Sequence, residues 1–70
     1  MLTKKQHRLL RFIDRYSKTR GYCPSFDEMM RGTRRRSKGS LAEVLDQLEN
    51  RGFIKRLPKR ARAIEVVRLP

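Results

Sequence analysis

An amphipathic helical pattern ends abruptly at Gly52 and gives way to a basic, β-forming segment. Apolar residues recur at helical spacing over residues 41–48, after a capping serine at Ser37. From Phe53 onward the chain is rich in β-branched and aromatic residues. This switch predicts a helix that leads directly into a hairpin. The rest of the chain carries no apparent chemistry. We therefore expect function to lie on the surface formed by this helix and hairpin.

Length and composition predict one small domain. A chain of 70 residues buries only about 60% of the surface that its unfolded form exposes. We therefore expect residues 1–70 to form a single domain. The hydrophobic fraction of 37% suffices for a small core but leaves little room for a ligand cavity.

The charge balance points to nucleic acid. The chain has 19 Lys and Arg against 7 Asp and Glu, a net charge of +12, which makes nucleic acid the expected partner. A membrane surface is the weaker alternative, because the apolar spacing suits a core better than a broad lipid-facing stripe. No apolar run or signal sequence is found, and Cys23 is the single cysteine, so we expect a cytosolic protein.

Two further helices precede the one that ends near Gly52. Thr3 and Gln6 form a capping box for the first helix, and Gly21 supplies its end. Ser25 and Glu28 form a second capping box, which opens a short helix. We interpret the methionines of that helix as core residues.

The third helix follows a turn predicted at residues 32–34. Ser37 is its expected cap, and Ser40 with Glu43 is an alternative start one turn later. Four apolar side chains should face inward: Leu41, Val44, Leu45 and Leu48.

Two strands are predicted after this helix, over residues 53–57 and 64–69, with residues 58–63 as the hairpin tip. The order of three helices and a hairpin predicts an α+β winged helix-turn-helix. Such folds present the start of one helix to base edges in the major groove.

The first turns of the third helix are suited to reading DNA. Small residues let a helix lie deep in the groove, hydroxyls hydrogen-bond bases or phosphates, and a glutamate can accept from cytosine. The candidate base-reading residues are Ser37, Lys38, Gly39, Ser40, Ala42 and Glu43.

Each of these residues also has a purely structural interpretation. Ser37 or Ser40 is equally well explained as a helix cap. Glu43, Asp46 and Glu49 fit an ordinary solvated face, and such an acidic stripe also suits a basic protein partner. Asp46 and Glu49 are expected to lie clear of the groove, because acids beside phosphates are unfavourable.

Two basic clusters flank the third helix, one before it and one on the hairpin that follows. Either cluster alone could be a solvated charge run, but together they suit the two sides of a groove. Arg56 belongs to the same basic run of the hairpin. The candidate phosphate-binding residues are Arg31, Arg34, Arg35, Arg36, Lys55, Lys59, Arg60 and Arg62.

Catalytic and metal-binding functions are not expected. The sequence has no Ser-His-Asp, Cys-His or paired-carboxylate pattern, so we predict no enzyme activity and no cofactor. His7 has no second ligand at metal-binding spacing, and we interpret it as a surface or half-buried histidine.

Several motifs resemble the amino-terminal DNA-binding domain of the LexA repressor family, in its alphaproteobacterial form. They are residues 1–7 (MLTKKQH), 24–29 (PSFDEM), 37–38 (SK), 51–58 (RGFIKRLP) and 60–66 (RARAIEV). The resemblance extends over essentially the whole chain. It implies a winged-helix fold, operator binding through the third helix, and contacts of the hairpin with the DNA backbone.

Three departures from the family pattern change what the resemblance implies. The turn at residues 32–36 is more basic than the usual Leu-Gly type, and residues 39–43 replace a Ser-Gly-Ile-His-Arg pattern with small and acidic groups. We expect either a different operator or weaker reading of bases. The family's self-cleaving peptidase domain, which also forms its dimer interface, has no counterpart in residues 1–70.

These observations support two functions. The first is a LexA-like regulator that binds double-stranded DNA and most simply represses by occupying a promoter. The second is an adaptor that docks on RNA polymerase or another regulator, with mainly backbone contacts to DNA. We expect a monomer in solution, with pairing on a palindromic site, because +12 charges repel between copies.

Overall fold

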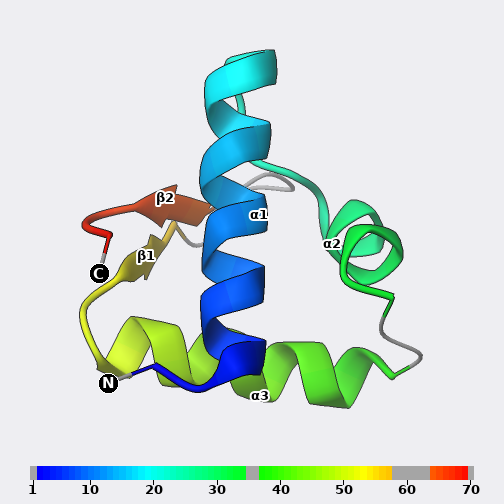
Figure 1. Ribbon diagram of the computed structural model, residues 1–70, viewed down its shortest axis with the longest axis vertical. Helices are drawn as coiled ribbons and strands as arrows, with labels where there is room; N and C mark the ends of the chain where they lie inside the picture. The colour runs from blue at the N-terminus through cyan, green and yellow to red at the C-terminus, as the bar shows by residue number, and fades with distance from the viewer. Residues whose placement is uncertain (1, 35–36, 58–63, 70) are drawn as a thin grey trace.

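The computed structural model describes residues 2–34, 37–57 and 64–69. Its elements confirm the predicted order of three helices and a hairpin (Figure 1). They are α1 (Lys4–Arg20), α2 (Phe26–Gly32), α3 (Lys38–Asn50), β1 (Ile54–Arg56) and β2 (Ile64–Val66). The antiparallel pair β1–β2 is referred to below as the wing.

Helix starts follow the predicted caps. Both capping boxes are formed, at Thr3 for α1 and at Ser25 for α2. The third helix begins after Ser37, whose Oγ accepts the backbone N–H of Ser40 at 3.4 Å. The alternative start at Ser40 is therefore wrong, because Ser40 already lies inside the helix.

The predicted turn at residues 32–34 begins one residue too early. Gly32 is the last residue of α2, because the backbone N–H and the hydroxyl of Thr33 both donate to the Met29 carbonyl and hold the chain helical. A Cβ at Gly32 would lie 2.2 Å from the Phe12 ring. The glycine therefore lets α2 pack closely against α1.

The core lies where α1 crosses α3 (Figure 1). All four side chains predicted to face inward from α3 are buried, which confirms that helix face. Met29 is also buried and Met30 packs against the core, as expected for these methionines. The buried hydrophobic cluster is Leu9, Leu10, Ile13, Met29, Leu41, Val44, Leu45, Leu48 and Ile54.

Both strands are shorter than predicted. The paired residues are Ile54 with Val66, Lys55 with Glu65, and Arg56 with Ile64. Beyond this ladder, the backbone N–H groups of Val67 and Arg68 both converge on the Phe53 carbonyl, at 2.8 and 3.3 Å. The prediction of a strand to Leu69 is thus wrong, and the predicted tip at residues 58–63 lies outside the described residues.

Arg56 holds the wing against α3. Its Nη1 lies 2.9 Å from Asp46 Oδ1, and its Nη2 donates to the Ala42 carbonyl at 3.4 Å. Its backbone N–H donates to Glu49 Oε2 at 3.1 Å. Asp46 and Glu49 are exposed, as expected for a solvated face, but both also contact Arg56, which belongs to the docking of the wing.

We predict a measurable coupling between Arg56 and Asp46. A double-mutant cycle with Arg56→Gln and Asp46→Asn should give about 0.5 kcal/mol in the free energy of unfolding, because the pair is partly exposed. Urea denaturation followed by circular dichroism measures it. The matched control is Lys55→Gln with Asp46→Asn, since Lys55 is the strand neighbour that makes no such contact. Equal coupling in both cycles would contradict this docking role.

Candidate nucleic-acid interface

The candidate base-reading residues lie together on the first two turns of α3. Ser37, Lys38, Gly39 and Glu43 are exposed, whereas Ser40 and Ala42 are half-buried at the edges of the same surface. The buried face of the helix fixes this arrangement, because it points the opposite face away from the core. The six residues therefore share this surface or its edges, and their contacts with bases remain a prediction.

Different elements border the two flanks of α3. On one flank, Gln6 of α1 donates from Nε2 to Gln47 Oε1 at 2.7 Å. On the other flank, Arg56 of the wing binds Ala42 and Asp46. The exposed surface of α3 is thus a ridge with α1 on one side and the wing on the other.

Gly39 is not required by the packing of the fold itself. Its φ is not positive, and among the described atoms an added Cβ would meet only Ser37 Oγ, at 3.6 Å. That distance is an ordinary van der Waals contact. A bare backbone at this point therefore leaves space for something outside the protein to approach.

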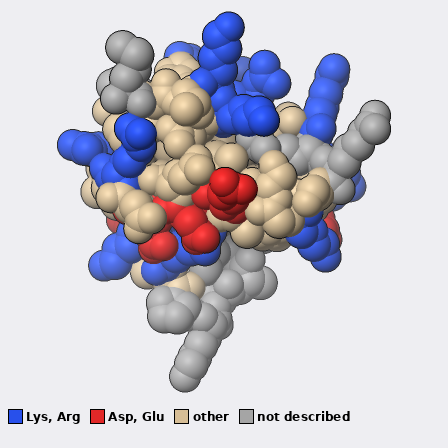
Figure 2. All heavy atoms as spheres, turned by 90° about the horizontal axis from the view of Figure 1, so that it is seen from below, with Lys and Arg blue, Asp and Glu red and all other residues tan. Residues whose placement is uncertain are grey.

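Acidic side chains occupy the middle of the same face. Figure 2 shows the molecule from beneath α3, with acids near the centre and Lys and Arg around them. The exposed acids of α3 are Glu43, Asp46 and Glu49. Arg56 contacts Asp46 and Glu49. Glu43 lies nearest the start of the helix and is the one of these three acids that Arg56 does not contact.

Three of the candidate phosphate-binding residues lie in the described part of the chain, and all three are exposed. Arg31 is in the last turn of α2, Lys55 is on β1, and Arg34 follows α2 with a φ of 56°. This positive φ is uncommon for a residue other than glycine. The other predicted cations, Arg35, Arg36, Lys59, Arg60 and Arg62, lie outside the described residues.

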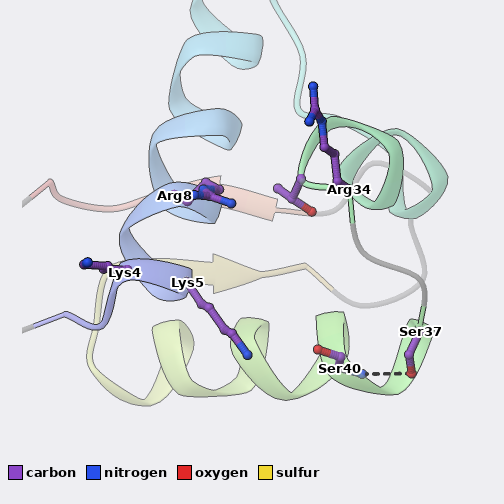
Figure 3. A pocket seen from close by; sticks show the side chains of 7 residues that line it. Lys4, Lys5, Arg8, Arg34, Ser37 and Ser40 are labelled. Carbon is purple, nitrogen blue, oxygen red and sulfur yellow. Dashed lines mark hydrogen bonds between the residues drawn. The ribbon is translucent and has the colours of Figure 1, made fainter.

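The structure adds a basic hollow that the sequence analysis did not identify. It has a volume of about 470 Å³ and lies between the start of α1, the end of α2 and the start of α3 (Figure 3). The described residues that line it are Lys4, Lys5, Arg8, Thr33, Arg34, Ser37 and Ser40. The signal for it in the sequence was the first turn of α1, which carries two lysines and no acid.

No metal site or membrane segment is found in the described ranges. Within them, no three His, Cys, Asp or Glu side chains come together as metal ligands. His7 is half-buried, as expected. None of the helices that the structure describes combines the length and hydrophobicity needed to cross a bilayer.

Comparisons with known proteins agree with this fold. The profile of the LexA DNA binding domain matches residues 1–63. The LexA repressor of Gluconacetobacter diazotrophicus is 53% identical over 70 residues, which is 100% of this chain and 28% of that protein. The chain therefore spans little more than a quarter of the length of this relative. It belongs to the LexA DNA-binding domain family.

Proposed function

We propose that residues 1–70 form one domain that regulates transcription by placing the start of α3 in the major groove of duplex DNA. The observation that carries this proposal is the exposed first turn of α3, with its small residues, between two flanking elements that bear cations. Repression by occupying a promoter is the simplest mechanism. The name of the similar protein, LexA repressor, supports that direction of regulation.

The shape of α3 suits this role. The major groove is wide enough to admit one α-helix, and the residues at the start of that helix come closest to the base edges. Gly39 and Ala42 keep this end of α3 narrow, while Ser37, Lys38 and Ser40 supply hydrogen-bonding groups. Glu43 would accept a hydrogen bond from a cytosine amino group.

The cations on both sides of α3 would hold the DNA backbone. The predicted set includes Arg31, Arg34 and Lys55, together with the arginines and lysine of residues 35–36 and 59–62. If about six of these charges neutralise phosphates, log K falls with log salt at a slope near −5. Such contacts fix position and orientation but carry no base information directly.

The acidic centre of the α3 face favours a second candidate function. Glu43, Asp46 and Glu49 would repel phosphates if the helix lay deep in the groove along its whole length. In this alternative, the domain docks on RNA polymerase or another regulator through this face. DNA contacts would then be mainly to the backbone, and transcription would be modulated or activated.

Binding by one copy should be weak. A net charge of +12 opposes contact between free copies, so we propose a monomer in solution. Two copies on a palindromic site would gain affinity only where linkage raises their effective concentration.

The two functions predict different DNA preferences. We expect a duplex selected for binding to bind more than a thousandfold tighter than random duplex at the same salt concentration, as specific regulators do. Fluorescence anisotropy at fixed ionic strength measures this ratio. A ratio near one, with RNA polymerase retained on a column of the immobilised protein, would instead support the adaptor.

Adding a side chain at Gly39 should separate DNA binding from folding. We expect Gly39→Ala to leave stability equal or slightly higher, because alanine is the better helix former and the site is open. Gly39→Leu should weaken binding of the selected duplex by tenfold or more, about 1.4 kcal/mol.

The matched control for bulk is Asn50→Leu, at the far end of the same exposed face. Thermal unfolding and anisotropy are measured for all three variants. An unchanged affinity in Gly39→Leu, with the fold intact, would remove the start of α3 from the interface.

Glu43 should determine base preference. We expect Glu43→Ala to change the preferred base at one position of the selected site, and to leave affinity for random duplex equal or slightly higher. Selection from a randomised duplex pool, followed by sequencing, measures the preference. Glu65→Ala, an exposed acid on β2, is the control. The assignment is wrong if both variants select the same site as the unmodified protein.

A further inference from the structure

We propose that the basic hollow at the start of α1 binds a phosphate of the DNA backbone, on the side of α3 opposite the wing. The residues that carry the contact are Lys4, Lys5 and Arg8, which are exposed on the first two turns of α1. This inference rests on the proposed function, because it presumes that α3 lies in the groove.

The lining of the hollow has the chemistry of an anion site. Among the described residues that line it, the charged side chains are all cationic, and the polar ones are hydroxyls. Figure 3 shows Lys5 extending from α1 toward α3, with its end facing the Ser40 side chain. Lysine and arginine side chains around hydroxyl groups are typical ligands of phosphate oxygens.

These cations are placed where they do not stabilise the free protein. The N-terminus of a helix carries partial positive charge, so a cation there costs about 0.3–1 kcal/mol. The first turn of α2 follows the usual rule and contains Asp27 and Glu28, whereas that of α1 contains no acid. In the ranges that the structure describes, ion pairs are formed by Lys18 and Arg56 but not by Lys4, Lys5 or Arg8. A bound anion would relieve this repulsion.

The hollow lies where the second phosphate backbone that borders a major groove would run. A helix in the major groove has one phosphate backbone on each side. The Gln6–Gln47 hydrogen bond fixes the first turns of α1 to one flank of α3. Arg56 fixes the wing to the other flank. The wing and the hollow would therefore contact opposite strands.

The test compares two pairs of neutralised cations on α1. The double variant Lys4→Gln with Lys5→Gln removes charge at the hollow. Arg11→Gln with Arg15→Gln removes the same charge from exposed positions of α1 outside it. Binding of random duplex is measured by anisotropy from 50 to 300 mM salt, and folding by circular dichroism.

For the Lys4/Lys5 variant we expect the magnitude of the slope of log K against log salt to fall by about 1, because one phosphate contact is lost. The slope of the Arg11/Arg15 variant should be unchanged. Equal slopes for the two variants would overturn the hollow as a site but leave the proposed function standing. Failure of the unmodified protein to bind any duplex would overturn both.

A titration with inorganic phosphate distinguishes the source of the anion. We expect duplex, and more weakly phosphate, to shift the amide resonances of Lys5, Arg8 and Ser40 while those near Arg15 stay in place. Shifts at the hollow with phosphate but none with duplex would overturn the assignment to the DNA backbone.

Discussion

The packing of α1 across α3 is the constraint on which the other features depend. Leu9, Leu10 and Ile13 of α1 meet Leu41, Leu45 and Leu48 of α3, and all six are almost fully buried. Burial of one face of α3 fixes which residues point outward, and therefore which can reach DNA. The same crossing brings the first turn of α1 to one flank of α3. It leaves the other flank open to the wing, so a mainly apolar contact determines the layout of a polar surface.

Charge is divided across this surface in a way that composition does not reveal. Acids lie along the exposed ridge of α3, and cations lie around them (Figure 2). Arg56 contacts Asp46 and Glu49 on the flank of α3 that faces the wing. These contacts reduce the electrostatic repulsion between the two acids. The cost is that one cation of the wing is no longer available for phosphate. The net charge of +12 is therefore larger than the positive charge that any single face presents to DNA.

Local signals predicted the helices well, and long-range contacts account for what was missed. The capping serines and threonine, with the glycine at Gly21, located the helix boundaries because caps depend on neighbouring residues only. Sequence spacing alone could not show that Arg56 turns back to Asp46 or that Gly32 meets Phe12. The hollow was missed for the same reason, since it joins Lys5 to Ser40 from separate elements. The length of β2 was overestimated because β-forming residues continue after the hydrogen-bonded ladder ends.

Stability and DNA binding are coupled in a domain of this kind. A core of this size leaves a small margin of stability, and clustered cations reduce it further by mutual repulsion. A polyanion that binds only the folded state removes that repulsion and adds about 2.7 kcal/mol at a concentration of 100 Kd. If the hollow binds a DNA phosphate as proposed, the unfavourable lysines at the start of α1 are compensated in the complex. Lys4 and Lys5, which oppose the dipole of α1 in the free domain, are therefore the cations at which DNA binding should add most to stability.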